Sequence, residues 1–570
     1  MRDRERLLAI ARGDAPAELL LANARVVNTF NGEIEEASVA VSQGLIVGVG
    51  DYGEGNEILD LKGKFLAPGF IDGHIHLESS HLSPAEYARA VVPRGVLGVV
   101  TDFHEIANVC GVPGIEYILN SAENLPMDVF GMAPSCVPAT HMETSGAELD
   151  AESLKQVMKI PGVIGLGEMM NFPGVMFGDV GVWDKLELFG GKVIDGHCPG
   201  LRGNSLNAYL ASGIRSDHEC TSLDEAREKL SRGMYIMIRE GSAEKNLETL
   251  LPLLTDSTFR RCFFVVDDRD CADLLRDGDV DAVVRKAIGM GLDPVRAIQM
   301  ATINTAEYFR LERLGAVAPG YRANLIVFDD LNAPTAGAVY YDGKLVAEDG
   351  KLAVPVNQIT DDNLKRTVNI KPFGIEALRI PVEGDTYPVI ELIPGQIVTE
   401  YVKEKVEADD GYLRVDVERD ILKLAVVERH KATGNIGLGL VRGFGIRKGA
   451  FASSIAHDSH NIVAVGASDE DILAAVEELK RIQGGIAVAE EGRIISSLAL
   501  PVAGLISEEP LENLVDKFEE LRSAAAGLGC KVSAPFAVLS FLALPVIPEL
   551  KLTDMGLVDV LAFQLLDGGC

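Results

Sequence analysis

The stretch PGFIDGHIHLE at residues 68–78 contains an apolar run that leads into His74 and His76. Side chains two apart in a β-strand project from the same face, so both imidazoles can serve one site. Seven later stretches also run from apolar to polar residues: LGVVTDFHE (97–105), MDVFGMAPS (127–135), VIGLGEM (163–169), KVIDGHCP (192–199), GIRSDHE (213–219), MYIMIREGS (234–242) and FFVVDDR (263–269). Eight such strands alternating with helical stretches predict an α/β fold, a (β/α)8 TIM-like barrel with its active site at the C-terminal strand ends. A doubly wound open sheet is the alternative, but it does not require eight strands that end in this way.

The ends of other predicted strands add residue types that bind metal. With His74 and His76 they supply four imidazoles and two carboxylates at one rim, enough for two divalent ions. The four additional residues are Glu168, His197, His218 and Asp267. The alternative is that these residues cap strands or support a site without binding metal. Adjacent Asp267 and Asp268 should point to opposite faces of a strand, so only one of them should reach the metals. We choose Asp267, which comes first after the apolar run, and expect Asp268 to pair with Arg269.

Two short β units flank the predicted barrel. Residues 18–66 contain apolar runs separated by Gly and Asn, which suits a small antiparallel sheet, and residues 323–353 have a similar texture. We expect the two flanks to pack together as one discontinuous small β domain. The chain then divides into residues 1–66, 67–322, 323–365 and 366–570.

Residues 366–570 predict a separate C-terminal α+β domain. Alternating strands precede the amphipathic helix SDEDILAAVEELKRIQ (468–483), for which Ser468 is the expected N-cap, and a second helix covers LENLVDKFEELRSAAAGLG (511–529). This domain also contains His457 and His460 on either side of Asp458. The pattern is compatible with a third metal site, a lid over the substrate or a hydrogen-bonded core turn, and we favour the last two.

Composition excludes several functional classes. A formal net charge of -32 repels phosphate backbones and anionic lipid, so no nucleic acid and no membrane partner is expected. The eight cysteines include no CxxC pair, which fits a reduced cytoplasmic protein better than a disulfide framework or a thiolate zinc site. The N-terminal residues lack the pattern of a signal peptide. The longest apolar stretch, residues 534–548, contains three prolines and falls short of the ~20 residues that span a bilayer.

The rim residues resemble the ligand pattern of the amidohydrolase superfamily. That pattern places His-x-His after strand one, a bridging Lys or Glu after strand four, His after strands five and six, and Asp after strand eight. Strand four here offers Glu168 in GLGEMMN and no nearby lysine. The resemblance therefore implies a plain carboxylate bridge in place of a carboxylated lysine.

Within that superfamily, nearly the whole chain resembles the bacterial and archaeal adenine deaminase family. Six barrel stretches carry the resemblance: PGFIDGHIHLESSHLSP (68–84), DFHEIANVCG (102–111), GLGEMMNFPGV (165–175), DGHCPGL (195–201), SDHE (216–219) and VVDDR (265–269). Three more lie in the C-terminal region: VERHKATGNIGLGLVRGFG (427–445), IAHDSHN (455–461) and LPVAGL (500–505).

The resemblance implies a hydrolase that converts adenine to hypoxanthine and ammonia in purine salvage or catabolism. It implies two divalent ions, with manganese or iron favoured and zinc possible, which activate a hydroxide for attack on C6. Asp267 would accept the proton of the water and pass it to the leaving amine. His104 and Glu105, at the end of strand two, and Glu78 are candidate substrate contacts, and Glu105 is a candidate to protonate the purine ring. For all three residues, a packed loop is the alternative.

Other functions remain open at this point. One is an amidohydrolase that opens a cyclic amide or acts on a different nucleobase, and another is an inactive barrel that serves as a scaffold. We expect a small-molecule purine as the substrate. We also expect a homo-oligomer, with a dimer favoured.

Overall fold

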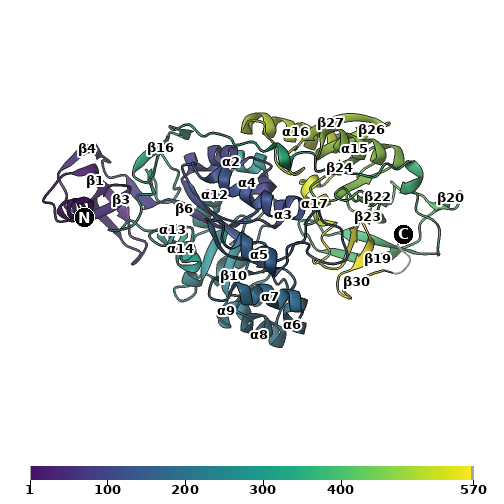
Figure 1. Ribbon diagram of the computed structural model, residues 1–570, viewed down its shortest axis with the longest axis horizontal. Coiled ribbons are helices and arrows are strands. Elements are labelled where there is room, and N and C mark those ends of the chain that lie inside the picture. Colours follow the sequence, from purple (N-terminus) through teal and green to yellow (C-terminus); the bar gives the residue numbers. More distant parts are fainter. Residues whose placement is uncertain (1, 567–570) are drawn as a thin grey trace.

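The computed structural model describes residues 2–566, which form three parts along the longest axis of the molecule (Figure 1). An N-terminal β-sheet occupies one end, parallel strands surrounded by helices occupy the middle, and a second β-sheet with its helices occupies the other end. The middle part contains the predicted metal-binding residues, and the two end parts are in contact with it.

All eight predicted strands of the middle part are present. They are β6 (Phe70–Ile75), β7 (Val96–Asp102), β8 (Asp128–Ala133), β9 (Val163–Met169), β10 (Val193–Gly196), β11 (Ser216–Asp217), β12 (Tyr235–Arg239) and β13 (Cys262–Val265). Strands β6–β10 form one parallel sheet and β11–β13 another. Main-chain hydrogen bonds join the two sheets at both seams, from Arg215 N to Ile194 O at 3.3 Å and from Asp267 N to His74 O at 2.9 Å. The parallel strands therefore form a TIM-like barrel.

Helices cover the outside of the barrel, because each strand must be followed by a crossover before the next parallel strand begins. They are α2 (Pro84–Val91), α3 (His104–Cys110), α4 (Val112–Ala122), α5 (Ala151–Val157), α6 (Phe172–Phe177), α7 (Val180–Leu188), α8 (Gly203–Ala211), α9 (Leu223–Ser231), α10 (Leu247–Leu250), α11 (Cys271–Arg276), α12 (Val280–Gly289), α13 (Pro294–Met300) and α14 (Ile303–Phe309). The apolar side chains between the strands and most of the helices belong to one hydrophobic cluster, and those inside the barrel, such as Val100, Met132 and Phe263, form a second cluster with residues of α14.

Strands from both flanks of the barrel form one sheet, with helix α1 (Arg2–Ala11) beside it. The strands are β1 (Ala17–Val27), β2 (Ile34–Ser42), β3 (Leu45–Gly50), β4 (Gly55–Asp60), β5 (Phe65–Pro68), β14 (Leu325–Phe328), β15 (Ala338–Tyr341), β16 (Lys344–Glu348) and β17 (Lys351–Leu352). The antiparallel pair β5–β14 joins the two flanks. The expectation of an antiparallel sheet is wrong in part, because β1 pairs in parallel with both β4 and β5. After β3 the chain turns back, so that β4 and β5 run alongside β1 in the same direction as β1.

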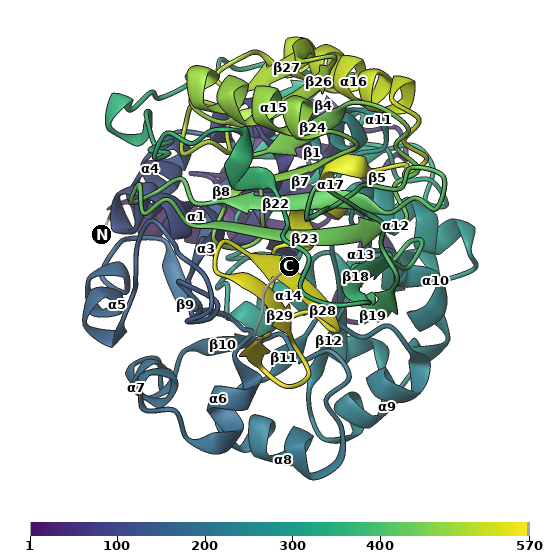
Figure 2. The same ribbon diagram turned by 90° about the vertical axis from the view of Figure 1, so that its right-hand side faces the viewer.

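The C-terminal part contains a mixed eight-stranded sheet, which Figure 2 shows from the C-terminal side. Its strands are β18 (Tyr387–Leu392), β19 (Thr399–Glu404), β22 (Leu422–Val427), β23 (Ile436–Arg442), β24 (Ala450–Ser453), β25 (Ile462–Gly466), β26 (Gly485–Glu490) and β27 (Arg493–Ala499). Two small sheets accompany it: β20 (Ala408–Asp409) with β21 (Tyr412–Leu413), and β28 (Leu550–Thr553), β29 (Gly556–Asp559) and β30 (Gln564–Leu565).

Three helices pack on the C-terminal sheet: α15 (Asp469–Ile482), α16 (Leu511–Gly527) and α17 (Pro535–Phe541). Ser468 caps α15 as predicted, because its hydroxyl accepts the Asp471 N–H at 3.2 Å. Helix α16 contacts β26 and β27 on one side and the barrel helices α2 and α11 on the other, so it joins the C-terminal part to the barrel.

Two further observations bear on the composition. No helix between residues 2 and 566 is long and apolar enough to cross a membrane. Seven cysteines in the same range are free thiols, and Cys570 lies outside the described residues.

Candidate metal centre

The six predicted metal-binding residues converge at the C-terminal rim of the barrel. They come from the ends of β6, β9, β10, β11 and β13, and none is more than 5% exposed. They are His74, His76, Glu168, His197, His218 and Asp267. The convergence follows from the barrel itself, since parallel strands bring all their C-terminal ends to one face.

Glu168 stands between two groups of histidines. Its Oε1 lies 3.2 Å from His76 Nε2 and 3.8 Å from His74 Nε2. Its Oε2 lies 2.7 Å from His197 Nδ1 and 3.1 Å from His218 Nε2. Each oxygen of one carboxylate therefore faces a different imidazole pair, which is the arrangement of a bridging ligand.

Asp267 adds an oxygen to the first of these pairs. Its Oδ1 lies 3.0 Å from His76 Nε2 and 3.3 Å from His74 Nε2. Asp267 was expected to reach the metals from within a strand. Instead, β13 ends at Val265, and Asp267 lies in the turn after it with a φ of +61°, outside the strand conformation. Asp268 also stays near the centre, with a carboxylate oxygen within 4.8 Å of the ligand atoms of His76 and Asp267.

The predicted pairing of Asp268 with Arg269 is wrong. Asp268 accepts a hydrogen bond from the Ser79 hydroxyl. The Arg269 guanidinium donates to the Glu240 carbonyl at 2.9 Å and lies 3.8 Å from Asp277. The turn after β13 sends the two neighbouring side chains in different directions, which strand alternation did not anticipate.

The geometry of the six residues fits metal ions. Nitrogen and oxygen ligands about 2 Å from an ion lie roughly 3 Å from one another around it, which matches the separations above. His197 Nδ1 and His218 Nε2 are 3.3 Å apart and face the same oxygen, although two imidazole lone pairs repel unless a cation or proton lies between them. His74 Nε2 is buried and has no hydrogen-bond partner among the described residues. The set contains no thiolate, so it suits manganese, iron or zinc equally by ligand type.

Arg239, at the end of β12, is part of the site and was not anticipated from the sequence. It donates one hydrogen bond to Asp267 Oδ2 at 2.6 Å and two to the carboxylate of Glu219, one of them at 3.1 Å. Burial alone would raise the pKa of Asp267, but the Arg239 and His218 cations hold it well below its usual range. An arginine at the C-terminal end of an apolar barrel strand was the signal that could have revealed it.

The predicted substrate contacts lie beside the metal-binding residues. His104 and Glu105 begin α3, and the two imidazole rings of His76 and His104 have centroids 4.5 Å apart. Glu78 lies in the short 3-10 helix Leu77–Ser80, where its Oε1 accepts the Ile106 N–H at 3.1 Å. Burial raises the pKa of Glu78 to about 7.

Two histidines of the C-terminal part reach Glu105. His457 Nδ1 lies 2.6 Å from Glu105 Oε1, and His460 Nε2 contacts Oε2. His104 Nε2 lies 3.1 Å from Oε1 as well. Burial favours the neutral form of Glu105, but His457, His460 and His104 together hold its pKa well below the usual range. The His-Asp-x-His segment of the C-terminal part therefore packs against the barrel rim, a position that its local pattern did not reveal.

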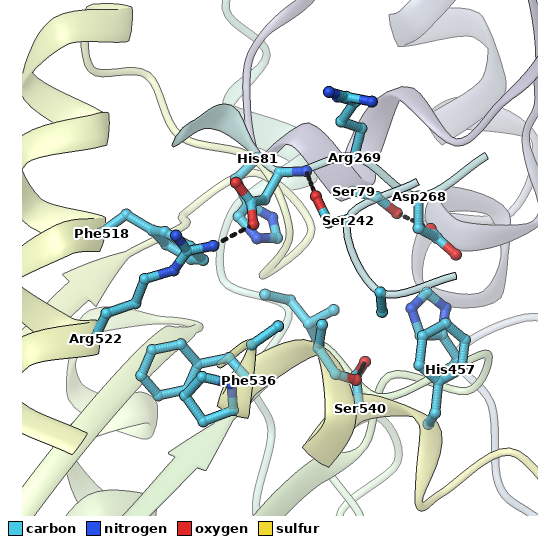
Figure 3. Close-up of a pocket in the computed structure, with 17 residues that line it drawn as sticks. Ser79, His81, Ser242, Asp268, Arg269, His457, Phe518, Arg522, Phe536 and Ser540 are labelled. Atoms are coloured by element: carbon cyan, nitrogen blue, oxygen red, sulfur yellow. Dashed lines mark hydrogen bonds and ion pairs between the residues drawn. The ribbon is translucent and has the colours of Figure 1, made fainter. Parts of the chain in front are cut away.

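A cavity of about 50 Å³ lies between the barrel and the C-terminal part. Figure 3 shows Ser79, Asp268 and His457 at one end of it, and Phe518, Arg522 and Phe536 at the other. Arg522 pairs with Asp270 at 2.6 Å across the two parts of the chain. The cavity therefore reaches the neighbourhood of the metal-binding residues through Asp268.

Comparisons with known proteins match both large parts of the chain. The family model described as Amidohydrolase family matches residues 65–368, and the one described as Adenine deaminase C-terminal domain matches residues 396–564. An adenine deaminase of Dehalococcoides mccartyi is 60% identical, over 98% of this chain and 98% of its own. Adenine deaminase 2 of Carboxydothermus hydrogenoformans is 51% identical with the same coverage. Among solved structures, a β-aspartyl dipeptidase of Fervidobacterium islandicum is 19% identical, covers 59% of this chain and 99% of its own, and has a TM-score of 0.46.

Proposed function

This chain belongs to the adenine deaminase family of the amidohydrolases, and we propose that it hydrolyses adenine to hypoxanthine and ammonia at the rim of its barrel. The observation that carries the proposal is the position of Glu168, whose two oxygens face two separate imidazole pairs. The full-length relatives and the matched C-terminal domain support adenine over a cyclic amide as the substrate.

We assign two divalent ions to the centre, with manganese or iron favoured over zinc. His74, His76 and Asp267 would hold one, His197 and His218 would hold the other, and Glu168 would serve both. Bound there, the ions supply a water that loses its proton near neutral pH and can attack a ring carbon.

Asp267 is the proton carrier in this proposal. The reaction forms a C6–O bond and breaks the bond between C6 and the exocyclic nitrogen, so a proton must move from the attacking water to the departing amine. Asp267 Oδ1 faces the same point as His74 and His76, within reach of a water held there. Arg239 on the other oxygen keeps the carboxylate turned in that direction.

His104 and Glu105 begin α3, just after the end of β7, where a purine above the metal-binding residues would place a ring nitrogen. Glu105 carries hydrogen bonds from imidazoles, which can supply the proton that a ring nitrogen takes up as C6 is attacked. The burial of both residues keeps bulk water away, which strengthens these charged hydrogen bonds.

The proposal is tested by assaying purified protein loaded with manganese or iron. The fall in adenine absorbance and the release of ammonia should both be seen, and a sample stripped of metal by a chelator should show neither. Guanine, cytosine, hydantoin and dihydroorotate serve as competing substrates. A metal-loaded protein that leaves adenine unchanged overturns the proposal.

A further inference from the structure

The C-terminal part holds both oxygens of a barrel carboxylate. Glu105 belongs to the first turn of α3, whereas His457 and His460 are more than 350 positions away in the sequence. One histidine contacts Oε1 and the other contacts Oε2. Both contacts join the C-terminal part to the barrel, so a role for them involves both parts.

The surroundings of the two rings indicate which nitrogen of each carries a proton. The backbone N–H of Ala456 donates to His460 Nδ1 at 3.2 Å, so a neutral His460 carries its proton on Nε2, which faces Glu105. An ionised carboxylate only accepts, so His457 Nδ1 donates to Oε1. Glu105 thus accepts a hydrogen bond from His457 on Oε1 and has His460 Nε2 in contact with Oε2, so both of its oxygens face an imidazole of the C-terminal part.

The segment that carries both histidines is itself anchored. Arg429 is fully buried, donates through Nε to the His460 carbonyl and through Nη2 to the Ala503 carbonyl at 3.0 Å. Asn461 donates to the carbonyl of Thr144, in the barrel, at 2.8 Å. A donor held this firmly loses little entropy when it bonds to a carboxylate.

His457 also has a second environment. Its ring stacks on Phe541 of α17, with centroids 4.4 Å apart and planes 15° from parallel. The ring lines the cavity together with Asp268 and Ser79, as Figure 3 shows. His457 therefore lies between the cavity and Glu105, at the place where a molecule bound over the metal-binding residues would meet the C-terminal part.

We propose that His457 and His460 are positioning residues for the deamination: they fix the carboxylate of Glu105 against the purine ring. This proposal rests on the proposed function and extends it, because it makes the C-terminal part a contributor to the active site. Glu105 is the group that meets the substrate, and the two histidines act through it.

The test compares His460→Met, which removes the donor, with His460→Gln, whose amide N–H can reach the same oxygen. In His460→Met we expect kcat for adenine to fall by about 10²-fold, the cost of misplacing a catalytic group by ~1 Å, with little change in KM. Metal content should match the wild type. His460→Gln should recover most of the loss, and His141→Asn, a change to an exposed histidine in the loop after β8, should behave as the wild type.

A double-mutant cycle separates positioning from a general structural role. If His460 acts through Glu105, His460→Met should cause little further loss of kcat in a Glu105→Gln background. Equal losses in both backgrounds, or a glutamine variant as impaired as the methionine variant, would overturn the proposal. Wild-type turnover of adenine is measured first. A wild-type protein that does not deaminate adenine contradicts the proposed function, whereas an active wild type with unaffected histidine variants contradicts only the positioning role.

Discussion

Replacing Glu168 with glutamine tests whether one carboxylate serves two metal positions. Oε1 faces His76 at 3.2 Å, and Oε2 faces His197 at 2.7 Å and His218 at 3.1 Å. Glutamine has the same shape but offers one oxygen and one amide group, which donates hydrogen bonds and does not bind a cation. Only one of the two positions can then keep an oxygen from this residue.

The structure indicates which position loses its ion. The position beside His74 and His76 retains the carboxylate of Asp267, whereas the position beside His197 and His218 would keep only neutral imidazoles. Metal content should therefore fall from two ions to about one per chain. If the lost ion contributed ~4 kcal/mol to the transition state, adenine turnover falls by about 10³-fold.

The assay is metal analysis of the purified variant by mass spectrometry, together with the absorbance assay on adenine. Glu244→Gln is the matched control, because Glu244 is a buried carboxylate in the loop after β12 whose oxygens have no hydrogen-bond partner among the described residues. It should keep two ions. A Glu168→Gln protein that also keeps two ions and near wild-type turnover would refute the bridging role.

Three further changes test other contacts of the site and fold. Asp267→Asn should lower adenine turnover by about 10²- to 10⁴-fold, the usual worth of a general base, with metal content near wild type; a parallel loss of metal would make Asp267 mainly a ligand. Arg239→Met removes the guanidinium that pairs with the buried carboxylates of Asp267 and Glu219. The free energy of unfolding of the metal-free protein, measured with urea, should fall by ~3–5 kcal/mol, and an unchanged midpoint would argue against a stabilising role of these ion pairs. Ser468→Ala removes the cap of α15 and should cost about 1 kcal/mol by the same measurement, while Ser468→Asp should keep the cap.

The barrel, and the meeting of the six candidate metal-binding residues at its rim, were predictable because their signals are local. Each strand is a short apolar run, and the residue that follows it lies at the rim whatever the loops do, which is why His197 and Glu168 meet although no sequence pattern links them. The same local reasoning failed where the chain turns. Asp267 leaves the strand with a positive φ, so strand alternation gave the wrong partner for Asp268.

Contacts between distant parts of the chain could not be predicted from one sequence. The parallel pairing of β1 with β4 and β5 depends on how two intervening strands fold back, which apolar runs and turn residues do not specify. The contact of His457 with Glu105 spans 352 positions, and each residue taken alone is equally compatible with a packed loop. Arg239 had a visible signal, a charge at the end of an apolar strand, but its partners Asp267 and Glu219 come from other strands.

The barrel and the C-terminal part, which separate family models match, are joined by polar contacts between buried side chains. A continuous series of side chains runs from His218 and Glu168 through His104 to Glu105 and then to His457, with successive atoms 2.6–3.6 Å apart. Every member of the series is buried, so removal of the C-terminal part would expose the rim to water and leave Glu105 with His104 as its only imidazole among these contacts. Solvent entering there would weaken each charged hydrogen bond through its higher dielectric constant. The C-terminal part therefore closes one side of the candidate metal centre, and a barrel without it should bind metal yet deaminate adenine poorly.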